Sequence, residues 1–430
     1  MAKTFNYGAG IWATKTGSSM AYNDQNDNYK PTPFSVTRDS IATRVNKQGL
    51  IEVVGHDKLR IDYKDSSNGV ALLEPSRTNY LPNSDNGSSY TTFSATKTLN
   101  EVISLDGTLN SFTLEGNGDY NQVLGESVSV TLPSAGDYTF SVFAKKGNNN
   151  FIQLFFNLFT GSSNGDAYFD LENGTTSSSF GRIEKYGNGW YKCSVVGTVV
   201  SGDLTGKFGF RVSYTSSNFF FPTANDAIGK NAHFYGFQLE QGSYATSYIP
   251  TSGSTYQRQS DVANGAGNEQ VFNDSEGVLF AAIANISSSG GDGYVSISSG
   301  SALNRATIRF TSATNNLACQ YVISGSNQTS MDNVLSDRTK FNKIAFKYKE
   351  NDFAVWVNGF ELSTDLIGST LTSDTLNELS FDNGSGVANF YGKTKEIGVY
   401  DTVLTDAELE ALTSYTSFTN MANELNLTIK

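Results

Sequence analysis

The sequence predicts an all-β protein in which an extended N-terminal segment precedes two antiparallel β-sandwich (jelly-roll) domains and a short C-terminal helix. Its 430 residues exceed the size of one ordinary domain. With 41 Gly, 13% aromatic residues and 17% charged residues, the composition suits several β cores better than a helical protein. Short apolar runs recur between clusters of Gly, Asn and Asp, which indicates strands joined by turns.

The texture of the sequence changes near residues 69 and 258, which predicts three parts. Residues 1–69 are polar and rich in turn residues, with short apolar patches such as Leu50–Val54 and Leu59–Tyr63. A segment of this kind gains order by packing on something else. We expect it to be extended and to serve attachment or oligomerisation, so that its removal leaves domains that fold but fail to assemble.

Residues 70–258 are predicted to form the first sandwich. The run Tyr138–Ala144 alternates well, and the turn signal Lys146–Asn149 separates it from the next apolar run. The strands expected in this part are 138–144, 151–156, 167–171, 190–195, 207–212 and 234–239.

Residues 259–430 are predicted to form the second jelly roll. Val278–Ala284 is nearly continuously apolar, as in a central strand that is covered on both faces. Asn358-Gly359 is the signal of a type I′ hairpin turn. Thr405 and Glu408 form a capping box, which predicts a short helix after Thr405. The other expected strands are 294–297, 305–310, 317–323, 342–349, 353–357, 378–381 and 395–400.

Charge and hydropathy exclude two classes of partner. A net charge of −12 and a pI near 4.7 argue against nucleic acid, because neutralising phosphates requires clustered basic residues. No stretch reaches the roughly 18 apolar residues of a membrane span, so no membrane insertion is expected. The N-terminus, MAKTFNYGAG, lacks the apolar core of a signal peptide. Cys193 and Cys319 each lie within an apolar run and are expected to be buried free thiols.

The third part resembles the concanavalin-A-like (laminin-G-like) jelly roll. The resemblance is carried by Lys343–Tyr348, Ala354–Gly359, Gly392–Asp401 and Leu404–Leu409, and covers roughly residues 274–417. It implies that the strand ending at Asp401, followed by the short helix, closes against the first strand of the domain.

A second resemblance runs from about Phe34 to Asp261. The stretches Thr37–Glu52, Arg60–Tyr63 and Leu72–Asn79 look like a module that recurs in structural proteins of tailed phages and prophages. Gly189–Cys193 and Phe237–Thr251 resemble the sandwich that follows this module, which is similar to carbohydrate-binding-module jelly rolls. The resemblance implies a virion fibre, spike or appendage protein of a kind that often contacts host-surface glycans.

We therefore expect a bacteriophage tail fibre or appendage, a virion structural protein made in the host cytoplasm, with a lectin-like, carbohydrate-binding role in host attachment. Its partners would be other virion proteins, bound through residues 1–69, and host cell-surface polysaccharide. We expect a homo-oligomer, for which a trimer is one arrangement. The alternatives are a capsid head fibre or decoration, a purely structural collar or tail component without sugar binding, and a polysaccharide depolymerase.

Catalytic patterns are sparse, and we expect no enzyme. His56 and His233 have no catalytic partner nearby in sequence, and G-x-S-x-G does not occur. Glycoside hydrolysis needs two carboxylates that flank the bond, and no strand carries the alternating acids of many concanavalin-A-like glucanases. Glu184 stands alone, while Glu408 and Glu410 belong to the predicted helix. No catalytic residue is assigned.

No cofactor or zinc site is expected either. Calcium stays an alternative because three turns offer oxygen ligands, although none has the spacing and acid count of a calcium loop. These turns are Asn23–Asp27, Ser163–Asp166 and Asp382–Gly384.

A sugar site needs an aromatic face for the C–H groups of the ring and amides or acids for the hydroxyls. Trp190 and Trp356 lie on apolar strands, where core packing is the favoured interpretation. Trp12 and the loops Asn148–Phe151 and Ser217–Phe221 are explained less well by a core. No single residue is assigned to glycan binding.

Overall fold

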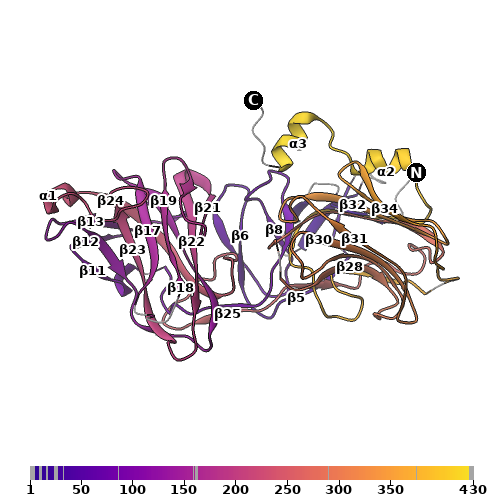
Figure 1. The fold of residues 1–430 in the computed structure, drawn as a ribbon, viewed down its shortest axis with the longest axis horizontal. Helices are drawn as coiled ribbons and strands as arrows, with labels where there is room; N and C mark the ends of the chain where they lie inside the picture. Colours follow the sequence, from indigo (N-terminus) through magenta and orange to yellow (C-terminus); the bar gives the residue numbers. More distant parts are fainter. Residues whose placement is uncertain are drawn as a thin grey trace. The chain divides into compact units, whose positions relative to one another are not determined.

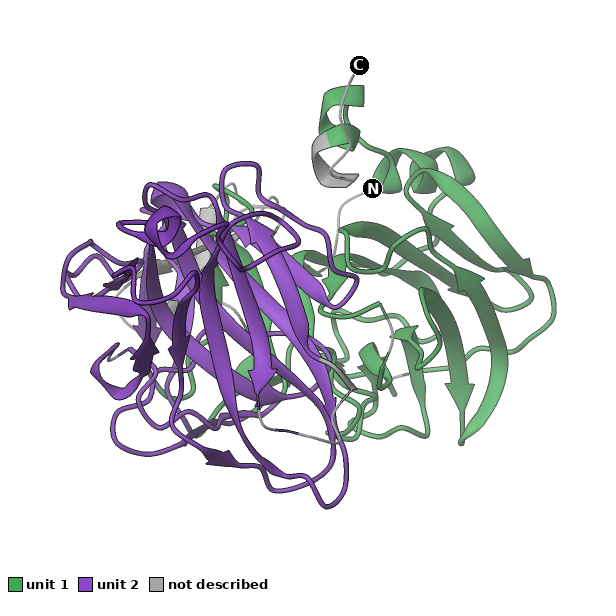
Figure 2. Ribbon diagram, turned by 60° about the vertical axis from the view of Figure 1, so that its left-hand side comes forward, with its two compact units in different colours: residues 1–39, 56–75, 260–430 green, residues 40–55, 76–259 purple. Residues whose placement is uncertain are grey.

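The computed structural model describes residues 5–8, 12–15, 18–23, 28–31, 33–85, 87–157, 159, 163–288, 290–373 and 375–425. It confirms the all-β prediction, because antiparallel strands dominate and the helices are short (Figure 1). The chain forms two compact units, each built from separate stretches (Figure 2). Unit 1 comprises residues 1–39, 56–75 and 260–430, and unit 2 comprises residues 40–55 and 76–259.

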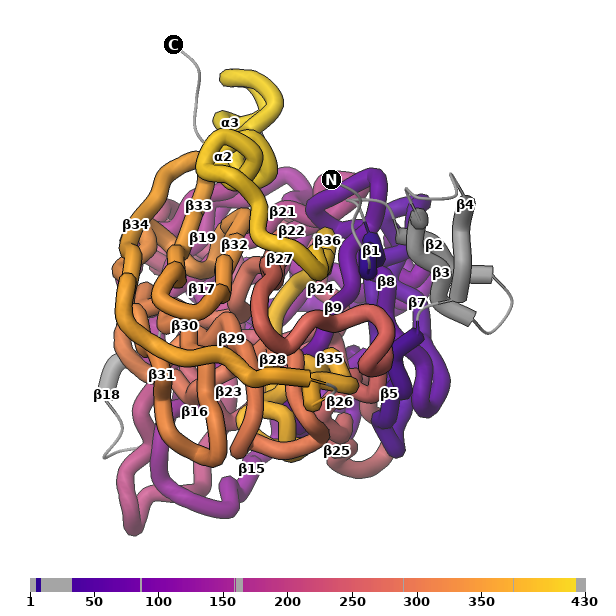
Figure 3. Tube along the Cα trace, turned by 90° about the vertical axis from the view of Figure 1, so that its right-hand side faces the viewer, coloured from indigo at the N-terminus to yellow at the C-terminus, as the bar shows by residue number. Residues whose placement is uncertain are grey.

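Unit 1 is a sandwich whose larger sheet has eight strands (Figure 3). In spatial order they are β34 (Phe360–Asp365), β33 (Phe353–Val357), β32 (Asn342–Lys349), β27 (Glu276–Asn285), β36 (Gly392–Tyr400), β9 (Val70–Leu73) and β8 (Arg60–Asp62), with β1 (Phe5–Tyr7) also paired to β36. The pairing of β36 with β27 is the closure that the concanavalin-A-like resemblance implies.

The second sheet of unit 1 has five strands, and the main core lies between the two sheets. Its strands are β31 (Ser326–Val334), β30 (Asn316–Ile323), β29 (Arg305–Phe310), β28 (Gly293–Ser298) and β35 (Glu378–Ser380). Smaller sheets of unit 1 pair β26 (Val262–Asn264) with β5 (Ser35–Thr37) and join β2 (Trp12–Lys15), β3 (Ser18–Asn23) and β4 (Asn28–Pro31).

The central strand β27 is buried on both faces, as its apolar run predicts. Leu279 and Ile283 face the core between the sheets, while Phe280 belongs to a second cluster that includes Leu409 of helix α2 (Asp406–Thr413). The capping box of α2 is present, because the Thr405 side chain accepts from the backbone of Glu408 and the Glu408 carboxylate accepts from that of Thr405. The helix α3 (Phe418–Leu425) was not predicted.

Unit 2 is a sandwich of two seven-stranded sheets around one aromatic-rich core. We call the first the Arg211 sheet: β11 (Thr91–Phe93), β14 (Val123–Glu126), β23 (Thr205–Ser213), β17 (Phe151–Asn157), β19 (Asp166–Asp170) and β20 (Thr175–Thr176), with β15 (Val130–Thr131) paired to β23. The second contains β12 (Ala95–Leu99), β13 (Phe112–Gly116), β24 (Asn231–Gln241), β16 (Gly136–Lys146), β22 (Trp190–Val199) and β18 (Ser163–Asn164), with β21 (Gly181–Lys185) paired to β22.

The outer face of this second sheet carries a separate apolar cluster. Phe143, Trp190 and Tyr235 pack there against Val45 and Ile51 of the hairpin formed by β6 (Ala42–Val45) and β7 (Ile51–Val54). Unit 2 also contains the pair β10 (Arg77–Asn79) and β25 (Tyr256–Arg258), the short helix α1 (Ala224–Ala227), and the 3₁₀ turns η1 (Gly87–Ser89) and η2 (Gly187–Gly189).

The described part of residues 1–69 differs from the predicted extended leader. Phe34, Leu59 and Ile61 belong to the core of unit 1, and residues 40–55 supply the hairpin of unit 2. The units therefore do not follow the expected boundaries at 69 and 258. The physical reason is that these short strands are ordered by partners far away in sequence, as in the pairings of β1 with β36 and of β5 with β26.

Four buried charged side chains of unit 1 form a cluster of ion pairs, and three of them lie next to a boundary between the units in the sequence. Arg38 Nη1 donates to Asp261 Oδ1 at 2.7 Å, and Arg60 Nη1 donates to Glu74 Oε2 at 2.7 Å. Arg60 also binds the second oxygen of Asp261, and the Arg38 amide donates to Asp57 Oδ1 at 2.8 Å. Arg38, Asp57, Glu74 and Asp261 each lie within two residues of a boundary between the units. The buried Arg–Asp–Arg–Glu cluster thus gives Arg38, Arg60 and Glu74 a structural role.

Within the described residues, no helix has the length and apolar character that crossing a membrane requires.

Candidate functional site

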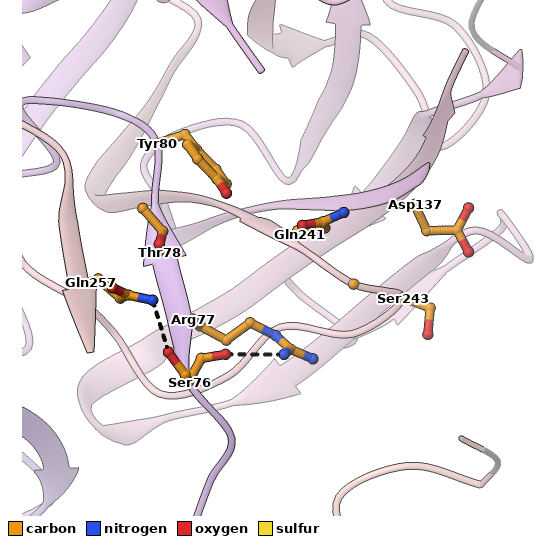
Figure 4. A pocket seen from close by; sticks show the side chains of 9 residues that line it. Ser76, Arg77, Thr78, Tyr80, Asp137, Gln241, Ser243 and Gln257 are labelled. Atoms are coloured by element: carbon orange, nitrogen blue, oxygen red, sulfur yellow. Dashed lines mark hydrogen bonds between the residues drawn. The ribbon is translucent and has the colours of Figure 1, made fainter. Parts of the chain in front are cut away.

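Unit 2 contains an open pocket of about 510 Å³, within the roughly 300–1,000 Å³ typical of small-molecule sites. Figure 4 shows Arg77 extending from β10 toward Ser243, in the turn after β24, with Gln241 at the end of that strand and Tyr80 at another side of the hollow. Asp137, at the start of β16, and Gln257 of β25 complete the polar lining. The pocket therefore gathers residues that are far apart in the sequence.

Asn79 brings the segments of the pocket together. Its side-chain Nδ2 donates to the carbonyls of Phe237, at 3.1 Å, and Ile249, at 2.9 Å. Its Oδ1 accepts from the amides of Leu239, at 3.0 Å, and Leu81, at 3.1 Å. Because Asn79 is fully buried, these bonds satisfy an amide that would otherwise be costly to bury. The stretches Leu72–Asn79 and Phe237–Thr251 thus meet at the pocket.

Arg77 is held from beneath by Glu240. Its Nε lies 3.7 Å from Glu240 Oε2, and its guanidinium lies 5.2 Å from the centre of the Tyr244 ring. Glu240 is fully buried and accepts hydrogen bonds from Thr246 N, at 2.9 Å, and Thr246 Oγ1, at 2.6 Å. Gly242 has a φ of +129°, and a Cβ there would lie 2.9 Å from Arg77 Nη2. The positive φ favours glycine at this position, and the missing side chain leaves space beside the guanidinium.

The remaining polar groups line the pocket from several strands. Gln257 Nε2 donates to Ser76 Oγ at 3.1 Å (Figure 4), and Gln241 Nε2 donates to Ser134 Oγ at 3.1 Å. Asp137 is exposed and accepts from Thr198 Oγ1 at 2.6 Å. Burial raises the pKa of Tyr80, so its hydroxyl stays protonated at neutral pH. One ring, two amides, a carboxylate and a guanidinium suit a polyhydroxylated ligand that alternates apolar and polar faces.

The aromatic residues singled out from the sequence lie outside this pocket. Trp190 is fully buried and Trp356 is 6% exposed, which confirms core packing for both. The side chain of Trp12 lies outside the described residues. Asn148 and Asn149 use their amides to hold the turn itself, since Asn148 Nδ2 donates to the Gly229 carbonyl and Asn149 Nδ2 to that of Ser213.

The aromatic side chains of the loop Ser217–Phe221 differ in burial. Phe221 is buried in the core of unit 2, whereas Phe220 is 45% exposed. Phe219 is half-buried and covers Arg211. Part of this loop therefore remains available for binding.

The residues considered for catalysis have ordinary local roles. His56 Nδ1 lies 3.3 Å from Asp39, and His233 Nδ1 lies 2.7 Å from Thr113 Oγ1. Glu184 pairs with Arg182 at 3.0 Å, and Glu408 caps α2, whereas Glu410 is exposed on the same helix. Cys193 and Cys319 are buried free thiols, as predicted.

The acid-rich turns are engaged in local bonds where they are described. Asp382 Oδ1 accepts from the Gly384 amide at 2.6 Å, and burial raises the pKa of this carboxyl group. Asp166 accepts from Gln153 at 3.4 Å, while residues 24–27 lie outside the described part of the chain. Among the described residues, no group of three His, Cys, Asp or Glu side chains is arranged to hold a metal ion.

The sequence did not identify Arg77, Tyr80, Asp137 or Gln241 as site residues. Arg77 and Gln241 nevertheless lie inside the two stretches that carry the phage-like resemblance. Their place inside these stretches was the available signal. Tyr80, which follows β10, and Asp137, at the start of β16, carried no such signal.

Comparison of the chain with protein-family models and with curated proteins gives no match. Solved structures that it resembles include the CBM40 module of the Ruminococcus gnavus IT-sialidase bound to α2,3-sialyllactose, with 18% identity and a TM-score of 0.29 over 35% of this chain and 94% of that one. Domain 4 of AbnA, a GH43 extracellular arabinanase from Geobacillus stearothermophilus in complex with arabinotriose, matches with 12% identity and a TM-score of 0.29 over 40% and 83%. A heptameric SAP-like pentraxin from Limulus polyphemus matches with 12% identity and a TM-score of 0.28 over 36% and 76%.

Proposed function

We propose that this chain is a non-enzymatic virion structural protein of a tailed phage, a tail fibre or appendage that attaches to host-surface glycans. The virion role is supported by the resemblance of residues 34–261 to phage structural proteins. The glycan role is supported by one observation above all, the pocket in which the two resemblance stretches meet around Arg77 and Glu240.

The chemistry of the pocket favours a sugar over an apolar ligand. Tyr80 offers an aromatic surface for C–H groups, while Gln241 and Gln257 offer both donors and acceptors for hydroxyls. Arg77 adds the several N–H donors of a planar guanidinium. Open pockets of this kind bind single sugars weakly, so several copies in one particle would provide firm attachment.

Binding without hydrolysis is supported by the positions and hydrogen bonds of the carboxylates at the pocket. Asp137 is the carboxylate that lines the pocket, and Glu240 beneath it is buried and bonded to Thr246. A glycosidase needs a second carboxylate that is free to act as acid, base or nucleophile. Incubation with a bound polysaccharide should therefore release no new reducing ends, and their appearance would establish the depolymerase instead.

A glycan array that includes bacterial surface polysaccharides tests the binding role with the full-length protein. The variants Asp137→Ala and Gln241→Ala should each weaken binding to the glycans found by about tenfold, the loss of one or two hydrogen bonds. Glu172→Ala removes an exposed carboxylate elsewhere in unit 2 and serves as the matched control. Equal binding by all variants, or no binding by a multivalent form of the protein, would refute the pocket as a glycan site.

Antibody labelling of phage particles tests the virion role separately. Label on the tail supports a fibre or appendage, and label on the capsid supports the head-fibre alternative. Particles that carry the protein on the tail but show no glycan binding would favour a purely structural component. Absence of the protein from particles would refute the virion assignment.

A further inference from the structure

The outer face of the Arg211 sheet carries polar and aromatic side chains on its central strands. Along β23, Phe208, Phe210 and Val212 point into the core. Because strand side chains alternate, Lys207 and Arg211 point to the outer face. Gln153 of β17 lies opposite Arg211 in the strand pairing. This face therefore presents a charged residue at the middle of a sheet.

Two aromatic rings position the guanidinium of Arg211. Its Cζ lies 3.9 Å from the centre of the Phe155 ring and 4.0 Å from that of Phe219, which comes from the 217–221 loop. Phe155 occupies space that a side chain at position 209 would fill, since a Cβ on Gly209 would lie 2.0 Å from the ring. The arginine is thus fixed in orientation before any ligand arrives.

Most hydrogen-bonding capacity of this guanidinium is unused within the described residues. Its hydrogen bond there runs from Nη1 to Gln153 Oε1 at 2.8 Å, and its buried Nε has no partner. It forms no direct ion pair with an Asp or Glu of the described chain, although Glu126 and Asp166 lie near enough to interact with its charge. Glu126 binds Lys207, at 3.3 Å, and Asn157, while Asp166 accepts from Gln153 at 3.4 Å.

This arrangement is costly without a ligand. Burial lowers the pKa of Arg211, while the nearby Tyr168, Glu126 and Asp166 raise it by less. A half-buried cation without an anionic partner loses hydration that it does not regain. A carboxylate that binds the free donors of Arg211 would provide the missing compensation, and planar carboxylates match the geometry of a guanidinium.

A ring surface lies directly beside the charge. Phe220 is 45% exposed, and its ring centre lies 4.1 Å from that of Phe219, which covers Arg211. Tyr168 faces Gln153 in the neighbouring strand. An aromatic surface next to a cation suits a pyranose that carries a carboxylate, because C–H groups pack on the ring while the acid reaches the arginine.

We propose that the outer face of the Arg211 sheet is a second binding site, which takes an acidic sugar of the uronate class with its carboxylate on Arg211. This site is distinct from the Arg77 pocket, so its failure would leave the proposed function standing. A protein with net charge −12 repels anions overall, so such a ligand needs this local cation.

Saturation-transfer NMR of the full-length protein with D-glucuronate tests the site, and D-glucose, which has a hydroxymethyl group in place of the carboxylate, is the matched ligand. Glucuronate should bind at least about tenfold more tightly than glucose. Arg211→Met should abolish that preference, while Arg211→Lys should retain only part of it. Phe220→Ser, which changes an exposed ring, should weaken glucuronate binding without affecting the fold.

The pocket variant Asp137→Ala should bind glucuronate as the native chain does. Protection of Cys193 from a thiol reagent would verify that unit 2 of each variant remains folded. The proposal is overturned if glucuronate does not bind, if glucose binds equally well, or if Arg211→Met leaves the preference intact. Equal binding of inorganic phosphate would also overturn it, because the site would then select charge alone.

Discussion

Arg60 and Asp261 form an ion pair across 201 residues of sequence, and both side chains are fully shielded from solvent. Asp261 also binds Arg38, so one carboxylate compensates two buried guanidinium groups. Removing one partner of a buried pair leaves the other charge uncompensated, which is more costly than the loss of the attraction itself.

Asp261→Ala should therefore lower the free energy of unfolding of unit 1 by about 3–5 kcal/mol. The matched control is Glu172→Ala, which breaks the exposed pair with Lys146 and should cost less than about 1 kcal/mol. Urea unfolding followed by hydrogen exchange of unit 1 peptides measures both. A loss below about 1 kcal/mol for Asp261→Ala would show that the cluster contributes little to stability.

The two cysteines should report the unfolding of the two units separately. Cys319 lies in the core of unit 1 and Cys193 in that of unit 2, and burial raises the pKa of both thiols. Because the thiolate is the reactive form, neither should react with a thiol reagent at pH 8 in the native protein. Both should react after unfolding.

In the Asp261→Ala protein, Cys319 should become reactive at a lower urea concentration than Cys193. Mass spectrometry of the labelled peptides distinguishes the two sites. Simultaneous labelling at all urea concentrations would mean that the units unfold as one.

Deletion of residues 1–69 should destabilise both units. The deletion removes Ile61 from the core of unit 1 and Ile51 from the cluster that covers Trp190. Loss of buried aliphatic side chains costs about 2–5 kcal/mol each. We therefore no longer expect the truncated protein to contain intact domains that merely fail to assemble. A lower thermal unfolding temperature of the truncated protein would show the loss of stability. An unchanged temperature would restore the view of an independent leader.

The stability of unit 2 should decrease as the pH is lowered, because His233 becomes protonated. Burial lowers its pKa below the ordinary value of 6.5, Lys145 lowers it further and Glu101 opposes both. The unfolded chain thus binds the proton at a higher pH than the folded unit does. The contribution of neutral His233 is complete above pH 6.5 and is lost as pH falls from there through the folded-state pKa.

His233→Gln should flatten this part of the pH profile of Cys193 protection in urea, whereas the exposed His56→Gln should leave it unchanged. An identical slope in the native protein and in His233→Gln would assign the dependence to other groups.

Local patterns predicted many of the long strands and one helix. Alternation identified β16, apolar continuity identified β27, and the capping box located α2, because each signal lies within one element. Asn358 and Gly359 both have positive φ, as their hairpin turn requires. The short polar strands such as β8 escaped prediction because their order comes from pairing and from the buried cluster. The pocket escaped prediction for a related reason, since Arg77 acquires its role only beside Glu240 and Gly242.

The division of the chain into units also sets the order in which they can fold on the ribosome. Unit 2 has all its strands once Gln259 has emerged, whereas β9 of unit 1 must wait for β36, which ends at Tyr400. During that interval β1 and β9 lack their partner β36, and exposed strand edges promote association between nascent chains. Synthesis of this protein therefore includes a stage in which a finished sandwich coexists with an unfinished one, when chaperone binding to residues 56–75 would be most useful.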